Sequence, residues 1–247
     1  MTLQLAKGVR DIPPETKLIK NKVINQLRQS FERFGFAPLE TPMIERFETL
    51  SAKFAAGEES DALSEIFPVT DNAKRKLALR FDLTVPLSRY VAMNKDLKYP
   101  FKRYEIGRVY RDGPIKLGRY REFWQCDIDI VGSKSMLAEA ELLAVAQSFF
   151  EKNDIDVTIK INNRKILTGA LEQAGIKDSK KQEAAIISID KLEKIQEKGV
   201  RKELEEKKFT SKQIDAMFKI IKKGMTLEEL KQIATNEQIK EGINSLE

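Results

Sequence analysis

The sequence predicts an α+β fold in which an antiparallel sheet with flanking helices precedes a small helical domain. Residues 119–130 alternate between apolar and polar side chains, as a strand does when one of its faces is buried. Residues 19–34 place apolar side chains three and four positions apart, which is typical of an amphipathic helix. Beyond residue 175 the chain becomes rich in Lys and Glu with helical spacing. We therefore expect one domain at 1–175 and a second at 176–247.

Two adjacent strands dominate the central part of the chain, RYEIGRVYRDGPIKLGRYREFWQCDIDIVG, which runs from Arg103 to Gly132. Residues 103–111 contain the β-branched and aromatic residues that strands favour, and Asp112-Gly113-Pro114 ends that strand. The strand that follows shows an apolar face made of Tyr120, Trp124, Cys126, Ile128 and Ile130, interrupted only by Glu122. Its other face carries Arg119, Arg121, Phe123, Gln125, Asp127 and Asp129.

This second face has an unusual composition for a solvated strand. Its side chains are about 6.5 Å apart along one line, because each strand residue rises roughly 3.3 Å. Arginines recognise phosphate oxygens, a phenyl ring can stack on a purine, and an amide and carboxylates can bind an amino acid. The pattern fits a nucleotide beside a small zwitterion. A charge-rich edge strand without a ligand is the open alternative.

Composition restricts the chemistry that the chain can perform. The absence of histidine excludes most zinc sites and Ser-His-Asp triads, so arginines, carboxylates, backbone groups and bound ions must carry any catalysis. The single cysteine, Cys126, is expected to be a small buried core residue. A net charge of +6 favours an anionic partner. No apolar run approaches the roughly 20 residues that span a bilayer, and no signal-peptide pattern opens the chain, so we expect a cytoplasmic protein.

The amino-terminal part predicts a helix, a proline-bearing strand and a hairpin. A helix is expected after Pro13-Pro14, with Thr16 as the candidate amino-terminal cap and Gly35 as the carboxy-terminal cap. The strand that follows, Phe36–Ile44, contains two prolines and must lie at a sheet edge or against a partner chain. A hairpin is expected between strands at 67–70 and 77–84. Its second strand would direct Arg80, Asp82 and Thr84 to one face.

The carboxy-terminal part is expected to be mostly helical. A helix at 136–150, a strand at 156–162 and a helix at 165–174 precede the Lys/Glu-rich segment. Lysines in that segment could form a basic face for RNA phosphates: Lys207, Lys208, Lys212, Lys219, Lys222 and Lys223. Neighbouring glutamates nearly balance them, so a solvated helix face is the alternative.

The run GRYREFWQCDIDIVG resembles the second signature of class II aminoacyl-tRNA synthetases, in the histidyl-tRNA synthetase version. The resemblance implies the class II antiparallel sheet, incomplete here, with the helical segment as the insertion domain that approaches the acceptor stem of tRNA(His). It also implies a homodimer formed through Phe36–Ile44. The segment LRFDLT resembles the archaeal and eukaryotic branch of this family.

The same resemblance implies roles for individual residues. Asp82, Leu83 and Thr84 would form the floor of the histidine pocket, with Asp82 and Thr84 on the α-ammonium. Gln125 would contact the main-chain groups of histidine, and Asp129 its imidazole ring. For ATP, Arg111 would bind the α-phosphate together with the histidine carboxylate, as the catalytic residue. The other ATP contacts would come from Asp112, Arg119 on the terminal phosphates and Phe123 on adenine, with Mg²⁺ bridging the phosphates.

Parts of the family pattern are absent from this sequence. The third class II signature, the histidine-recognition segment and the anticodon-binding domain are not found. We therefore expect a fragment, a split gene product or a truncated form that is inactive alone. The family places an acidic residue where this chain has Gly113, and Asp112 is the candidate replacement.

Two other functions remain as alternatives. The first is the synthetase-like regulatory subunit of ATP phosphoribosyltransferase, a histidine sensor without catalysis. That paralogue generally lacks the helical insertion domain and does not keep all of the ATP-binding residues. Arg111, Arg119 and Phe123 are all present here. The second is a dimerising or RNA-binding fragment without chemistry.

Overall fold

A computed structural model describes residues 2–52, 65–221 and 226–247, which divide into two compact units at Val157/Thr158. The boundary therefore precedes the expected one at 175/176. The reason is that helix α6 (Arg164–Gln173) packs closely on α11 (Glu237–Asn244), where Gly169 and Gly242 each leave room for an isoleucine of the other helix. In the described part of the chain, no helix is both long and apolar enough to cross a membrane.

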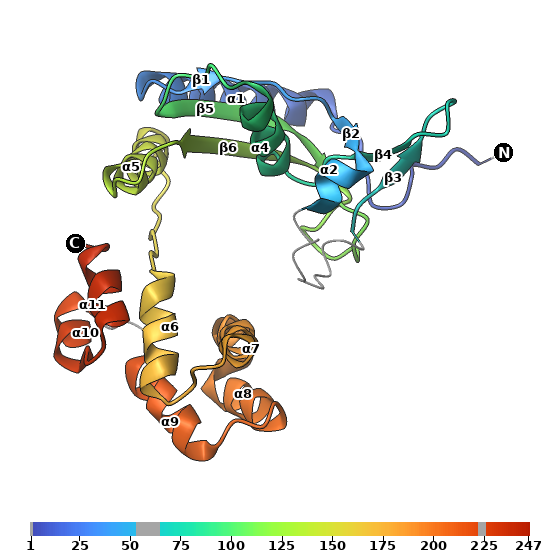
Figure 1. The fold of residues 1–247 in the computed structure, drawn as a ribbon. Helices are drawn as coiled ribbons and strands as arrows, with labels where there is room; N and C mark the ends of the chain where they lie inside the picture. Colours follow the sequence, from blue (N-terminus) through green and yellow to red (C-terminus); the bar gives the residue numbers. More distant parts are fainter. Residues whose placement is uncertain (1, 53–64, 222–225) are drawn as a thin grey trace. The chain divides into compact units, whose positions relative to one another are not determined.

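The main sheet contains the two long strands that the sequence predicts (Figure 1). Strands β5 (Phe101–Tyr110) and β6 (Glu122–Val131) pair antiparallel, with Arg103 opposite Asp129 and Gly107 opposite Gln125. The strand expected at 36–44 is reduced to β1 (Ala37–Pro38), which lies at the edge of this sheet, parallel to β5. Among the described residues, β6 has a strand on one side only.

A second small sheet has the order β2-β4-β3, formed by Ile44–Arg46, Lys76–Leu79 and Pro68–Thr70. The strand predicted to continue to Thr84 is wrong, because β4 ends at Leu79 and Thr84 begins helix α4 (Thr84–Met93). Residues 80–83 bend across β5, held by a hydrogen bond from the Tyr110 amide to the Arg80 carbonyl at 2.9 Å. The Asp82 carboxylate accepts from the Val85 amide at 3.0 Å, which favours the helix start.

Helices α1 (Pro14–Arg33) and α5 (Leu137–Lys152) contact one another and pack against the sheet around Phe31, Tyr104 and Val145. The short helix α2 (Phe47–Ser51) contacts β4 instead. The predicted apolar face of α1 is only partly buried, because Ile19 is 67% exposed.

Two further sequence predictions are wrong. Cys126 is exposed rather than buried, because the apolar face of β6 is incompletely covered at that position. Residues 156–162 form no strand, since no strand of the described chain pairs with them. Their alternating apolar side chains are consequently exposed; Ile159 and Ile161 are 41% and 53% exposed.

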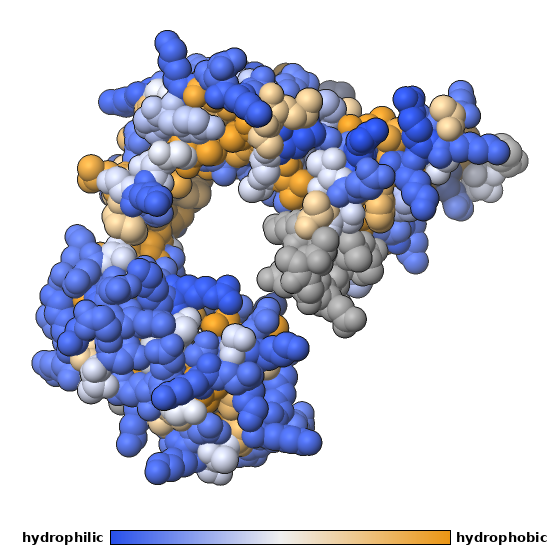
Figure 2. Space-filling view, viewed as in Figure 1, coloured by the Kyte–Doolittle hydropathy of each residue, from blue (hydrophilic) through white to orange (hydrophobic). Residues whose placement is uncertain are grey.

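The second unit is helical, as the sequence predicts. After α6 come α7 (Ser179–Ile189), α8 (Leu192–Glu206), α9 (Ser211–Ile220), α10 (Leu227–Ile233) and α11. Capping boxes at Thr210 and Thr226 start α9 and α10. The face in Figure 2 is covered mainly by hydrophilic side chains over these helices. Lys222 and Lys223 of the expected basic face lie outside the described residues.

One carboxylate of this unit makes its stability depend on pH. Hydrogen bonds from Lys191 (2.8 Å), then from Lys207, lower the pKa of Glu203 from 4.5 to about 2. Because the folded-state pKa is the lower one, this stabilisation is present above about pH 4.5 and is lost as pH falls towards 2. Glu203→Gln should flatten the pH dependence of helix melting, followed by circular dichroism, in that range. Glu206→Gln, on the same helix, is the matched control, and an equal flattening by it would contradict this assignment.

Candidate active site

The polar face predicted for the central strands extends over both of them. From β5 it receives Arg103, Glu105 and Gly107, and from β6 it receives Phe123, Gln125, Asp127 and Asp129. Alternation places these side chains on one face, and the antiparallel register places them opposite one another. The segment 80–84 and the loop between the strands lie at this face, so residues far apart in the sequence meet here.

Arg103 lies near one end of this face, opposite Asp129, and is fully buried. Its Nη2 is 2.7 Å from Asp129 Oδ2, and it also donates to the carbonyl of Leu83 at 3.1 Å. Its Nη1 is 4.0 Å from Glu105 Oε2. The buried Arg103 guanidinium thus lies among carboxylates, and its contacts connect the 80–84 segment to β5 and β6.

Two of the predicted histidine-binding residues, Leu83 and Asp129, contact this arginine, whereas Gln125 lies further along β6, opposite Gly107. Asp82 and Leu83 are buried, and Asp129 is partly buried. Burial raises the pKa of Asp127; Arg103 lowers it, while Asp129 and Asp82 raise it further. These carboxylates therefore share one region of negative charge. Thr84 is exposed at the start of α4, where its carbonyl accepts from Ser88.

The predicted ATP residues lie at the other end of the same face. Arg111 donates through Nε to the Phe81 carbonyl at 3.1 Å, and its guanidinium lies 5.1 Å from the centre of the Phe123 ring. Asp112 is exposed and pairs with Arg121 at 2.8 Å. Arg119 pairs with Glu65.

Several polar atoms of this face have unfilled hydrogen-bonding capacity. Among the described residues, no hydrogen-bond partner exists for these buried atoms: Arg103 Nε and Nη1, Gln125 Oε1, Asp129 Oδ2 and Arg121 Nε. Asp129 Oδ2 is close to Arg103 Nη2, but as an ion pair without hydrogen-bond alignment. Buried polar groups are normally satisfied, so a cluster of unsatisfied ones on one face is typical of a ligand site.

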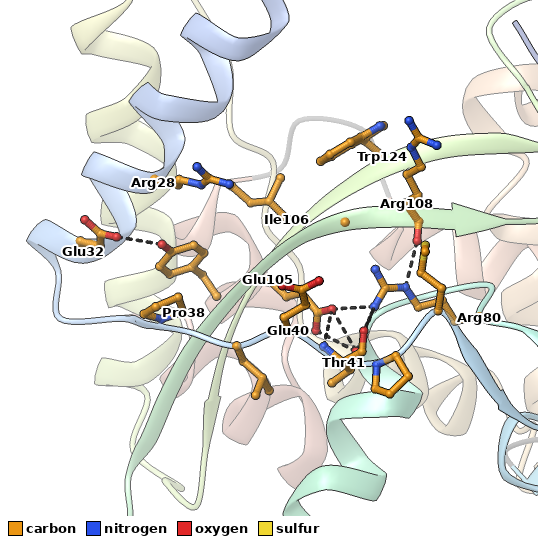
Figure 3. A pocket seen from close by; sticks show the side chains of 15 residues that line it. Arg28, Glu32, Pro38, Glu40, Thr41, Arg80, Glu105, Ile106, Arg108 and Trp124 are labelled. Carbon is orange, nitrogen blue, oxygen red and sulfur yellow. Dashed lines mark hydrogen bonds and ion pairs between the residues drawn. The ribbon is translucent and has the colours of Figure 1, made fainter. Parts of the chain in front are cut away.

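Sequence reasoning missed the ion network beneath the face. Glu105 accepts from the Thr41 amide at 3.0 Å and from Arg80 Nη1 at 2.7 Å (Figure 3). Arg80 also donates to the Thr41 carbonyl at 2.7 Å. Alternation along 103–111 places Glu105 on the polar face, but nothing in the sequence indicated its partners. The network connects the segment after β1 to the residues around Arg103.

Two cavities lie at the sheet formed by β5 and β6. One of about 890 Å³ is lined by Arg28, Thr41, Met43, Ile106, Arg108 and Trp124 (Figure 3). The other, of about 1040 Å³, is lined by Arg10, Lys17, Lys20, Tyr120 and Trp124. Both cavities are lined by Arg108 and Trp124, but the first also reaches Glu105 and Gly107, and the second also reaches Phe123.

The sequence of the chain matches a protein family described as histidyl-tRNA synthetase over residues 8–247. The chain belongs to the histidyl-tRNA synthetase family. It is 43% identical over 249 residues to histidine–tRNA ligase 1 of Bacillus cereus, and the match covers 100% of this chain and 56% of that protein. Histidine–tRNA ligase 2 of Shouchella clausii is 44% identical over 220 residues, covering 89% of this chain and 51% of that protein.

Solved structures agree with this family assignment. The histidyl-tRNA synthetase of Nostoc sp. PCC 7120 superposes with a TM-score of 0.84 at 32% identity, covering 100% of this chain and 56% of that one. The class II fold is thereby confirmed. A Bacillus halodurans protein described as an ATP phosphoribosyltransferase regulatory subunit/histidyl-tRNA synthetase has a TM-score of 0.78 at 20% identity, covering 98% and 62%, and shows the fold alone.

The chain spans just over half the length of the relatives described above. Those relatives are bacterial, so the expected likeness to the archaeal and eukaryotic branch has no support among them.

Proposed function

We propose that this chain is the amino-terminal part of a histidine–tRNA ligase, which activates histidine with ATP and transfers it to tRNA(His). The observation that supports this most is the set of unfilled buried hydrogen-bonding atoms on the polar face of β5 and β6. Carboxylates surround one end of that face, and Arg111 lies against the ring of Phe123 at the other. An amino acid at the first end and a nucleotide at the second would complement both.

The proposed reaction needs no protein nucleophile. The histidine carboxylate attacks the α-phosphate of ATP, which forms histidyl-adenylate and releases pyrophosphate. Arg111 would neutralise the charge that develops on the α-phosphate, Arg119 would bind the terminal phosphates, and Phe123 would stack on adenine. This explains how a chain without histidine side chains takes part in the chemistry.

Magnesium would accompany ATP in this reaction. Within the described part of the chain, no group of three or more His, Cys, Asp or Glu residues could hold a metal ion. The ion would therefore be held mainly by phosphate oxygens and water, as Mg²⁺ prefers when it binds with a nucleotide. Its contribution would be neutralisation of phosphate charge.

At the histidine end, the carboxylates favour a cationic substrate group. Asp82, Thr84 and Gln125 Oε1 would accept from the α-ammonium, and Asp129 from the imidazole N–H. Gln125 supports this role because its buried Oε1 has no partner among the described residues. Leu83 would form part of the floor, since it is fully buried beside Asp82.

Association with a second copy through Phe36–Ile44 is also part of the proposal. Met43 and Ile44 are about half exposed, at 49% and 51%, and α1 exposes Leu18 and Ile19. Exposed apolar side chains of this kind favour an interface. Sedimentation velocity should therefore show a dimer, and a strictly monomeric chain at micromolar concentration would contradict this part.

A substitution in the histidine pocket tests the proposal. In the complete ligase, Asp129→Ala should raise the KM for histidine at least tenfold, roughly the 1.4 kcal/mol expected for a charge-assisted hydrogen bond. Histidine-dependent exchange of pyrophosphate into ATP is the measurement. Glu122→Ala is the matched control, because Glu122 lies on the same strand but pairs with Arg108 on the opposite face. An unchanged KM for Asp129→Ala would remove this residue from the pocket.

The 247-residue chain alone should not catalyse this exchange, because it spans 56% of the length of the Bacillus cereus ligase. The same assay applied to the purified chain tests this, and measurable exchange would contradict it. A complete protein that binds histidine but never exchanges pyrophosphate would instead support the histidine-sensing alternative.

A further inference from the structure

Glu65 contacts both ends of the loop that joins β5 to β6, although it precedes Arg119 by 54 positions. Its carboxylate Oε1 pairs with Arg119 Nη2. Its backbone carbonyl accepts from the Asp112 amide at 2.7 Å. The Glu65 side chain is 15% exposed, against 47% for Arg119, so the carboxylate is the better fixed partner of the pair.

Gly113 makes the space that this carboxylate occupies. A Cβ added at Gly113 would lie 2.6 Å from Glu65 Oε1 and 3.2 Å from Arg119 Nη2. The backbone of Gly113 is not left-handed, unlike that of Gly118. A side chain at position 113 would therefore require the Glu65 carboxylate to move, whereas the backbone itself would not be strained.

Asp112 does not pair with Arg119, although it is next to Gly113 in the sequence. Its carboxylate pairs with Arg121 at 2.8 Å. The acidic side chain that the family pattern places at position 113 is thus matched in space by Glu65. The carboxylate beside position 113 is therefore supplied by a residue from a distant part of the chain.

We propose that Glu65 is a positioning residue of the nucleotide site, which holds the Arg119 guanidinium where it can bind phosphate. The inference rests on the proposed function, since it presumes that ATP binds at this end of the face. A guanidinium has five N–H donors, so pairing at Nη2 leaves others for phosphate oxygens. An arginine already fixed by a carboxylate loses less side-chain freedom when the nucleotide binds.

Titration of the 247-residue chain with Mg·ATP, followed by amide chemical shifts of the loop, tests the inference. Glu65→Gln should weaken binding roughly two- to fivefold, the range expected for a partly exposed ion pair. In an Arg119→Gln background, Glu65→Gln should have no further effect, because Glu65 acts through Arg119. Asp71→Asn is the matched control: it removes a carboxylate paired with Arg75 and should leave affinity unchanged.

A transfer of the carboxylate provides the sharper test. Gly113→Glu alone should weaken Mg·ATP binding, because two carboxylates would collide. The double variant Glu65→Ala/Gly113→Glu should recover affinity to within about twofold, as expected when one residue replaces the other. Unfolding midpoints show that each variant is folded.

Three results would overturn the inference. If Glu65→Gln leaves affinity unchanged or increases it, Glu65 does not position Arg119 for phosphate. If the folded double variant binds Mg·ATP as weakly as Glu65→Gln does, the two carboxylates are not equivalent. If the unaltered chain binds no Mg·ATP, the nucleotide site of the proposed function fails and this inference fails with it; failure of the variants alone leaves the proposed function intact.

Discussion

Replacing Glu105 by leucine is expected to lower the free energy of unfolding of the amino-terminal unit by about 3–5 kcal/mol, the range for removing one partner of a buried ion pair. Glu105 is 2% exposed and Arg80 is 3% exposed, so the arginine would be left buried without its carboxylate. The Thr41 amide would lose its acceptor as well. Urea unfolding followed by fluorescence measures this, because the single tryptophan, Trp124, lies in the same unit.

Two further variants separate the charge effect from general damage. Arg80→Met/Glu105→Leu should be more stable than Glu105→Leu alone, since it removes the uncompensated charge. Glu122→Leu breaks the exposed pair with Arg108 and should cost at most about 1 kcal/mol. A loss of less than about 1 kcal/mol for Glu105→Leu would show that the buried network does not support the fold.

Gly107→Ala is expected to destabilise the same unit by about 1–3 kcal/mol, the usual cost of overfilling a packed site. A Cβ at this position would overlap Arg80 Nη2, which lies against the glycine. The arginine would have to move, and its 2.7 Å contact with Glu105 would weaken. The same urea unfolding experiment measures the change.

The background Arg80→Met/Glu105→Leu provides the control for this second effect. There the guanidinium is absent, so Gly107→Ala should be neutral or stabilising by about 0.4–1 kcal/mol, because alanine restricts the unfolded chain. Equal destabilisation in both backgrounds would mean that Gly107 is needed for some reason other than room for Arg80.

The sequence was most informative where structure is local. Alternation over 119–130 identified β6 and its polar face, and the breaker at Asp112-Gly113-Pro114 identified the end of β5. Both features depend on neighbouring residues and the two-residue period of a strand. The positions of Phe123, Gln125 and Asp129 on one face followed from that period.

Features set by distant contacts were predicted poorly. The strand expected to reach Thr84 stops early because Tyr110 and Asp82 hold the backbone in a bend and a helix start. Cys126 lies on the face that alternation assigns to it, but alternation cannot indicate whether that face is covered. The partners of Glu105 and Arg119 come from segments that no local pattern connects to them.

The open side of β6 has a practical consequence for handling this protein. Among the described residues, one side of this ten-residue strand has no partner, so its row of amide and carbonyl groups is a template on which another extended chain can add. Concentrated samples should consequently tend to oligomerise through this row. A charged substitution at an outward-facing position, such as Cys126→Lys, should delay the onset of light scattering without altering the nucleotide end of the sheet.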